Sequence, residues 1–304
     1  MGCIFCRRLG VVGRVVLMKK ILLAILLSCC AIFTSISMVS AQEMPVLSPA
    51  LAEVQNAIVQ NDMEKANSLL EQQIASGEAI PAWLIKAQIA MVQRNPEGWN
   101  EAIENAQKLI EADKKNMEWY APLFFVRSMK AFQEGNLEQA KSEIMSAHKI
   151  VSASSYKNKQ WEAFINFFAA YLERKDNNTH ARKYAEKSID LYDSLKMKHE
   201  QAHATFLLAE LEWDRNKERR AYKAYDEALD LLKDAKAPGK CMAEVYIRIA
   251  QRQLSEGNPK VAESQLKLAE QVLGNLADSP DLAKIIQQVR AKIAENQNGE
   301  AKAE

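Results

Sequence analysis

The segment His199-Glu200-Gln201-Ala202-His203 is the one place in the sequence where residue types and spacing match a catalytic signature. On a helix, this HExxH spacing puts two imidazoles on one face with a carboxylate beside them. In zinc peptidases of this signature the histidines bind the metal and the glutamate acts as general base. A zinc metallopeptidase that uses His199, Glu200 and His203 is therefore one candidate function.

The sequence around this signature does not extend it. A catalytic zinc needs a third protein ligand, and the stretch ATFLLAELEWD after His203 contains no continuation of a known zinc-peptidase motif. The chain after residue 41 also lacks a GxSxG turn, a Walker-type loop and a CxxC pair. We predict that the protein is not an enzyme and uses no catalytic residue, cofactor or metal. His199 and His203 remain the alternative metal pair.

Residues 1–41 have the features of a targeting segment. They hold five basic residues and no acidic one, and from Met18 two lysines precede an uncharged stretch at residues 21–39. Small residues before position 42 fit cleavage after Ala41. We predict a secretory signal that starts at Met18, preceded by an upstream extension. The remainder would be exported, to the periplasm or the outside of the cell.

Three alternatives would hold the chain at a membrane. Cys29 or Cys30 could carry a lipid, because the residues before Cys29 loosely match a bacterial lipobox. Residues 21–39 could stay uncleaved, because their length is close to the roughly 20 residues of a membrane span. Met1-Gly2-Cys3 and Cys6 could instead indicate dual acylation. Only an uncleaved signal or a lipid anchor would bring this protein to a membrane.

The composition excludes several other classes. The formal net charge is +1, so no strong overall field attracts nucleic acid, and we predict no nucleic-acid partner. Few glycines and no long β-branched run argue against a large sheet and a phosphate-binding loop. Cys241 is the only cysteine after residue 41, which excludes an internal disulfide there. We expect it to be a small buried residue.

A repeat runs along the rest of the chain. Six polar turns each lead into an amphipathic stretch with an early alanine, and these alanines are 36, 38, 41, 40 and 41 residues apart. They are Ala66, Ala102, Ala140, Ala181, Ala221 and Ala262. Seven residues after the last four come the small residues Ala147, Ser188, Ala228 and Ala269. About a dozen residues before the last five come Ala90, Ser128, Ala169, Ala209 and Ala250.

The physical reason for this repeat is close approach of helix backbones. Residues seven apart lie on one helix face, so each pair of small residues marks a surface where two antiparallel helices can cross closely. One such helix pair cannot bury its apolar face alone, so neighbouring pairs must stack on a common core. The fold class is predicted to be all-α, without sheets. Counting back from Ala209, the helix there should begin near His203, with His199 in the preceding loop or first turn.

The predicted domain boundaries follow from this pattern. Residues 42–47 form a short linker, and residues 48–296 form the repeat domain. Its last helix, from Pro280, carries one apolar stripe and would cap the open face of the final repeat. Residues 297–304 are predicted to be a disordered tail.

The repeats resemble the tetratricopeptide family. The best matches are Gly135-Asn136-Leu137 with Ala140 and Ala147, and Gly257-Asn258 with Ala262 and Ala269. The spacings exceed the family's unit of about 34 residues. The resemblance implies a right-handed α-solenoid of about six helix-turn-helix repeats plus a C-terminal capping helix. It also implies that the first helix of each repeat lines a concave surface that binds a protein or peptide.

Mapping the inward-facing positions of these first helices gives a candidate peptide-binding groove. Its residues are Met91, Arg94, Phe125, Met129, Phe132, Asn166, Glu173, His203, Phe206, Glu210 and Trp213. The alternative for Phe125, Phe132 and Phe206 is a place in the core between repeats. We therefore expect an exported scaffold for protein–protein interaction. The alternatives are the metallopeptidase and a membrane-anchored structural or assembly factor of the cell envelope.

Overall fold

The computed structural model describes residues 53–54, 57, 62–77, 79–153 and 155–300. The predicted signal peptide and the linker 42–47 lie outside the described residues, as do all cysteines except Cys241. From Met63 on, the described chain forms twelve α-helices and two short 3-10 helices, and no strand occurs in it. None of the described helices combines the length and the apolar character needed to cross a membrane. The all-α prediction is confirmed.

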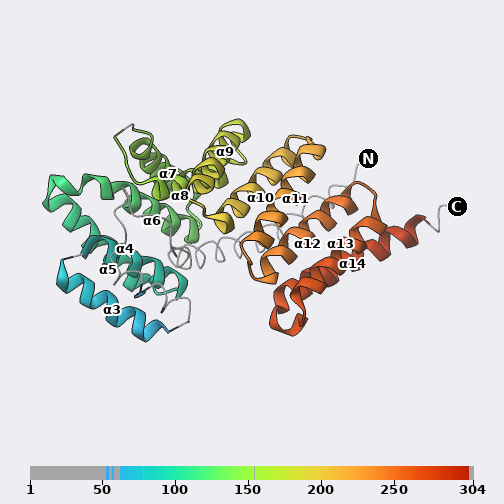
Figure 1. Ribbon diagram of the computed structural model, residues 1–304, viewed down its shortest axis with the longest axis horizontal. Helices are drawn as coiled ribbons and strands as arrows, with labels where there is room; N and C mark the ends of the chain where they lie inside the picture. Colours follow the sequence, from blue (N-terminus) through green and yellow to red (C-terminus); the bar gives the residue numbers. More distant parts are fainter. Residues whose placement is uncertain (1–52, 55–56, 58–61, 78, 154, 301–304) are drawn as a thin grey trace. The chain divides into compact units, whose positions relative to one another are not determined.

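The chain divides into two compact units, with the boundary between Leu172 and Glu173. The first unit contains, in chain order (Figure 1), α3 (Met63–Ser76), α4 (Ala79–Val92), α5 (Pro96–Ala112), η2 (Lys114–Trp119), α6 (Tyr120–Gln133), α7 (Leu137–Val151) and all but the last residue of α8 (Lys159–Glu173). The second contains α9 (Asn178–Ser194), α10 (Lys198–Asp214), α11 (Glu218–Asp234), α12 (Gly239–Ser255), α13 (Pro259–Leu273), η3 (Leu276–Asp278) and α14 (Pro280–Glu300). The helices pair as the repeat pattern predicts, α4 with α5, α6 with α7, α10 with α11 and α12 with α13.

Four of the six predicted turns sit between the two helices of these pairs, and their sequences explain why. Gly135 and Gly257 take positive φ values of 84° and 80°, a conformation that glycine adopts without a steric penalty. The asparagine after Gly135 then caps the next helix, since the side chain of Asn136 accepts a hydrogen bond from the amide of Gln139. Asn95 caps α5 in the same way. The turn chemistry therefore ends one helix and starts the next within three residues.

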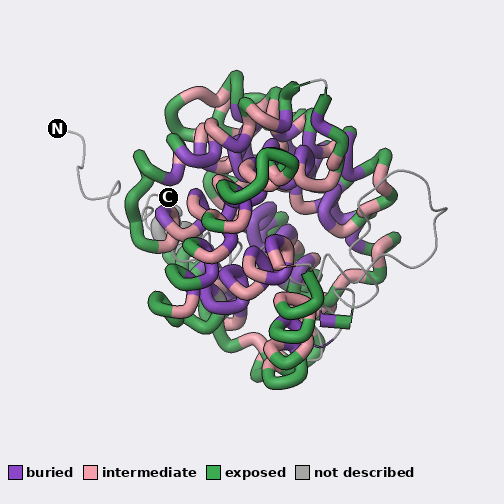
Figure 2. Tube along the Cα trace, turned by 90° about the vertical axis from the view of Figure 1, so that its left-hand side faces the viewer, coloured by how far each residue is buried: buried purple, intermediate pink, exposed green. Residues whose placement is uncertain are grey.

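The small residues of the repeat lie where helices cross. Every alanine and serine named for the pattern is at most 5% exposed, and Figure 2 shows buried and exposed residues alternating along the helices. At one crossing the hydroxyl of Ser128 on α6 donates a hydrogen bond of 2.5 Å to the carbonyl of Ala140 on α7. All these positions are therefore buried, as the prediction of close helix contacts requires.

Gly239 permits a further close approach at the start of α12. A Cβ atom on this residue would lie 1.9 Å from the carbonyl oxygen of Val272, in the last turn of α13. No side chain can occupy that space, so the first turn of α12 can pack on the end of α13 only with glycine here.

The last helix is longer than predicted. α14 runs to Glu300, so the predicted disordered tail 297–304 begins inside a helix, and residues 301–304 lie outside the described part. The extension adds Gln297-Asn298-Gly299-Glu300 to the helix although asparagine and glycine are poor helix formers, and no proline after Pro280 interrupts α14. Its apolar stripe is buried at Leu282, Ile286, Val289 and Ile293.

Candidate functional site

The predicted groove residues of the first unit are mostly core. Met91, Phe125, Met129 and Asn166 are buried, with at most 4% of their surface exposed. Phe132 is half-buried, and Arg94 is exposed in the turn after α4. The four buried side chains therefore hold helices together and do not offer a surface to a ligand.

An aromatic cluster explains the burial of Phe125. Its ring meets Trp161 and Phe168 of α8 edge to face, with centroids 5.6 and 5.7 Å apart. Phe132, two turns further along α6, meets Phe168 and Tyr171 in the same manner. Rings in this arrangement stabilise each other beyond their buried area. Phe125 thus belongs to the core between repeats, which was the alternative interpretation of this residue.

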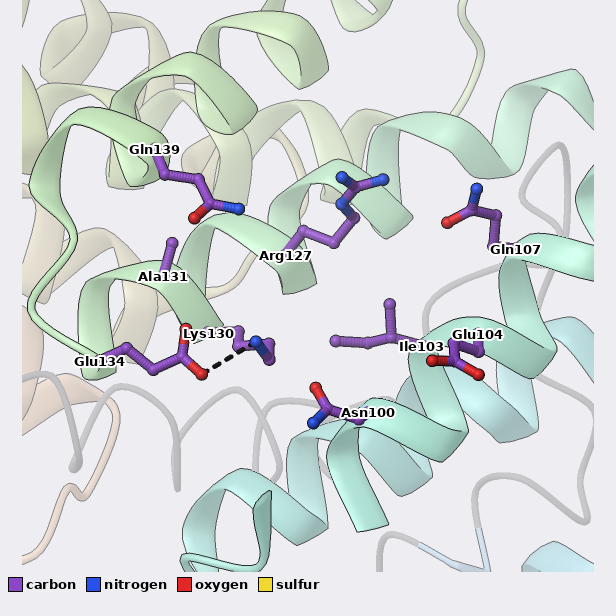
Figure 3. A pocket seen from close by; sticks show the side chains of 9 residues that line it. All are labelled: Asn100, Ile103, Glu104, Gln107, Arg127, Lys130, Ala131, Glu134 and Gln139. Atoms are coloured by element: carbon purple, nitrogen blue, oxygen red, sulfur yellow. Dashed lines mark ion pairs between the residues drawn. The ribbon is translucent and has the colours of Figure 1, made fainter. Parts of the chain in front are cut away.

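The first unit also has a polar pocket of about 220 Å³, shown in Figure 3. Its walls come from α5, α6 and α7, and include Arg127 and Lys130, whose ammonium pairs with Glu134 at 2.9 Å. None of the predicted groove residues lines it. The pocket is polar, and two of its walls come from α5 and α7, each the second helix of its repeat. The predicted groove, in contrast, lies on the first helices of the repeats.

The second unit brings a buried carboxylate and three arginines together. Glu210 on α10 is 2% exposed. One of its oxygens accepts hydrogen bonds from Arg174 (3.1 Å), in the turn before α9, and from Arg252 (3.0 Å) on α12. The other oxygen lies 3.4 Å from Nε of Arg248 and accepts a short hydrogen bond from the hydroxyl of Tyr225 on α11. We call these five residues the Glu210 cluster.

The charges of the Glu210 cluster do not balance. Burial alone would raise the pKa of Glu210, but the positive charges of Arg248, Arg252 and Arg174 outweigh burial and lower the pKa to about 2. One carboxylate therefore faces three guanidinium groups. Asp214, on the exposed side, pairs with Arg174 at 2.6 Å. The cluster keeps a surplus of positive charge.

Several buried donors of the Glu210 cluster have no acceptor among the described residues. These nitrogens are Nη1 of Arg174, Nη2 of Arg248 and Nε of Arg252. A buried donor without an acceptor costs free energy, so such groups usually mark a place where a ligand or water completes the bonding. Half-buried Trp213 stacks against Arg252, whose guanidinium carbon lies 4.7 Å from the centroid of the indole ring. Unused cationic donors thus lie beside an aromatic surface.

Sequence reasoning placed Glu210 and Trp213 in the groove but missed the three arginines. Trp213, Phe206, His203 and Glu173 are all half-buried, whereas Glu210 is buried within its cluster. Glu210 therefore cannot touch a ligand directly, and its role is to hold the arginines in place.

The HExxH residues lie at the start of α10, which begins at Lys198. The expected start near His203 is wrong by about one turn. The chain takes a left-handed conformation at Lys196 (φ 59°), and no helix breaker stands between Lys198 and His203, so the helix begins at once. The sequence predicted His199 in the preceding loop or in the first turn of the helix, and it lies in the first turn.

Cys241 lies beside His199 and His203, and it was not identified from the sequence as a possible metal ligand. It is buried in the first turn of α12, and its Sγ lies 3.8 Å from Nε2 of His199. The rings of His199 and His203 meet edge to face with centroids 4.7 Å apart. The expectation that Cys241 is a small buried residue is confirmed, but its contact with a histidine was not predicted because no histidine is near it along the chain.

The two histidines have opposite pKa shifts. Burial lowers the pKa of His199, but the hydrogen bonds to Cys241 and Glu200 outweigh burial and raise the pKa to about 9. Burial, and then the positive charge of His199, lower the pKa of His203 to about 3. Near neutral pH the pair therefore carries one positive charge, on His199.

The geometry of Glu200 does not suit a peptidase. Its Oε1 lies 3.8 Å from Nδ1 of His199, while the opposite ring nitrogen, Nε2, faces Cys241. A general base must reach a water bound on the metal side of the ligand nitrogens. Glu200 is buried on the other side of the ring, so this carboxylate orients His199 and does not face a substrate.

Comparison with known proteins places the fold. The sequence matches no protein-family model and no curated protein. The structure is similar to apo RapI (TM-score 0.64, 17% identity, 82% of this chain and 71% of that chain). It is also similar to a Rap protein complexed with Competence and Sporulation Factor, with a TM-score of 0.61 and 14% identity over 83% of this chain and 72% of that chain. A third similar structure is the apo quorum sensor NprR from B. thuringiensis, with a TM-score of 0.57 and 12% identity over 82% of this chain and 72% of that chain. The chain has the tetratricopeptide-like helical solenoid fold that the repeats predict.

Proposed function

We propose that this chain is an exported scaffold that binds an acidic segment of a protein partner at the Glu210 cluster and Trp213. The observation that carries the proposal is the set of unused guanidinium donors around Glu210, next to a half-buried indole. Arginine donors bind carboxylates with paired, charge-assisted hydrogen bonds, and an indole provides apolar contact beside them. Similarity to a Rap protein complexed with Competence and Sporulation Factor supports a protein or peptide as the kind of partner.

The proposal assigns different roles to the members of the site. Glu210 and Tyr225 hold Arg248 and Arg252 in fixed positions, which reduces the entropy lost when a ligand is bound. The side chains of Arg174 and Arg252 are 10% and 12% exposed, against 2% for Glu210, and their accessible parts would meet the acidic groups of the partner. No bond is made or broken in this function.

Selection from a random-peptide display library tests this site. We expect the full chain to enrich peptides rich in aspartate and glutamate, and Arg252→Gln or Trp213→Ala to weaken binding of the selected peptides about tenfold or more. Binding should also weaken with added salt, because charge pairs at a surface are screened.

Two matched substitutions serve as controls for that selection. Arg219→Gln removes an exposed arginine of α11, and Trp83→Ala removes a half-buried indole of the first unit. Neither should change the affinity. Peptides that show no acidic enrichment, or that bind Arg252→Gln as tightly as the parent, would contradict the proposed site.

Export is the second part of the proposal and rests on the sequence of residues 1–41. We expect the protein to be recovered from the periplasm or the medium with Gln42 as its first residue. Cell fractionation and N-terminal sequencing measure both. A membrane-bound chain that keeps residues 21–39, or one with a lipid on Cys29, would favour the anchored envelope factor instead.

A further inference from the structure

We propose that His199, His203 and Cys241 form a zinc-binding site that links α10 to α12. Among the described residues, these three side chains are the one group of histidine, cysteine and acidic residues placed to hold a metal ion. The site differs from the HExxH peptidase in its third ligand and in the role of the glutamate. It is also independent of the Glu210 cluster.

The distances suit a tetrahedral metal. The ligand atoms of the three residues lie within 4.8 Å of one another, and Sγ of Cys241 is 3.8 Å from Nε2 of His199. Zinc binds nitrogen at about 2.1 Å and sulfur at about 2.3 Å, so its ligand atoms lie about 3.4 to 3.6 Å apart. Side-chain rotations that move these atoms by roughly 1 Å would close the site, without a shift of either helix.

The donor set selects the metal. Two imidazoles and one thiolate are ligands that zinc prefers, whereas calcium and magnesium take oxygen ligands. Three protein ligands leave one tetrahedral position, which a water molecule would fill. His199 and His203 are four residues apart on one helix, so a single turn already presents two of the three ligands.

Glu200 supplies an independent indication of a bound cation. This carboxylate is 4% exposed, and its Oε2 has no hydrogen-bond partner among the described residues. Its other oxygen faces Nδ1 of His199, so the carboxylate and Cys241 lie on opposite sides of the ring. In zinc proteins a carboxylate commonly takes this position behind a ligand histidine, where it fixes the ring and strengthens the ligand. Glu200 is therefore a positioning residue for His199.

Zinc at this site would join two successive repeats. Cys241 belongs to the first helix of the repeat that follows α10 and α11, so the metal would fasten neighbouring first helices to each other. Because the unfolded chain does not preassemble the ligands, zinc binding would raise the thermal midpoint of unfolding.

Zinc titration of the metal-free full chain tests the site. To leave Cys241 as the only thiol, Cys3, Cys6, Cys29 and Cys30 are replaced by serine. We expect one zinc per chain by calorimetry and metal analysis. With cobalt in place of zinc, we expect a thiolate-to-metal charge-transfer band.

Variants assign the ligands. Cys241→Ser should weaken zinc binding by about 100-fold and remove the charge-transfer band. His203→Gln should weaken it similarly but keep the thiolate band at high cobalt. Glu200→Gln should cost about 10-fold to 100-fold in affinity and leave the band in place, as expected for a residue that acts through His199. His180→Ala, which removes an exposed histidine of α9, should change nothing.

The proposal is overturned if Cys241→Ser binds zinc as tightly as the parent, or if the parent binds no zinc or shows no charge-transfer band. Circular dichroism of each variant before titration shows whether the helices are intact. Should Cys241→Ser fail to fold, His203→Gln decides the question, since unchanged affinity in that variant would equally exclude the site.

Discussion

Replacing Glu210 by glutamine should lower the free energy of unfolding by about 3–5 kcal/mol. The substitution keeps the shape of the side chain and removes its charge, which leaves Arg174, Arg248 and Arg252 without their shared buried counter-ion. Breaking a buried ion pair from one side costs this much because the remaining charge stays desolvated. Urea unfolding of the full chain, followed by circular dichroism, measures the change.

Asp214→Asn is the matched control for Glu210→Gln. Asp214 pairs with the same Arg174, but 34% of its side chain is exposed, so water can replace the lost partner. We expect a cost below about 1 kcal/mol. Equal costs for the two variants would mean that the burial of Glu210 does not decide its contribution.

The pH dependence of stability gives a second measurement of the same carboxylate. The folded protein holds the pKa of Glu210 at about 2, below the value of about 4.3 for an unperturbed glutamate. As the pH falls, the unfolded chain therefore takes up this proton first. The stabilisation from Glu210 is complete above about pH 5 and is lost as the pH falls towards 2. The difference in stability between the parent and Glu210→Gln should shrink over that interval, and a constant difference would contradict the assignment.

A buried ionic cluster of this kind is not needed for stability alone. Replacing all its charged members by well-packed apolar residues is often neutral or stabilising in other proteins. The surplus of guanidinium groups around Glu210 therefore favours a role in binding. Glu210 lowers the cost of keeping Arg248 and Arg252 desolvated, and in the proposed function the unused donors of Arg174 and Arg252 would bind the partner.

The fold could be predicted because its main requirement leaves a simple pattern. Two helices cross closely only over small side chains, so Ala181, Ala221 and Ala262 recur at the length of one repeat and are fully buried. The start of α10 could not be placed as well. The preceding loop turns at Lys196, where φ is positive although the residue is neither glycine nor asparagine, and Met197 then stands as the N-cap residue.

The site residues were harder to predict because their sequence signals are ambiguous. Arg248 and Arg252 resemble solvated charges in a helix, and only the packing of α10 against α12 shows that they share Glu210. The contact of Cys241 with His199 could have been found from the repeat. The two residues are 42 positions apart, close to the 41 that separate Ala209 from Ala250, so they occupy nearly equivalent places in successive repeats.

Ala262→Leu tests the close crossing of α12 and α13 on which the repeat interpretation depends. Ala262 is 0% exposed, so three added carbon atoms have no free space and must displace neighbouring side chains or backbone. We expect a loss of about 1–3 kcal/mol in the free energy of unfolding, measured by urea denaturation.

Ala291→Leu is the matched control, because Ala291 lies on the exposed side of α14 in the same unit. That variant should change stability by less than about 0.5 kcal/mol, since leucine and alanine both favour helices. If Ala262→Leu is as stable as Ala291→Leu, the small residues of the repeat do not mark the helix crossings, and the predicted register of the repeats is wrong.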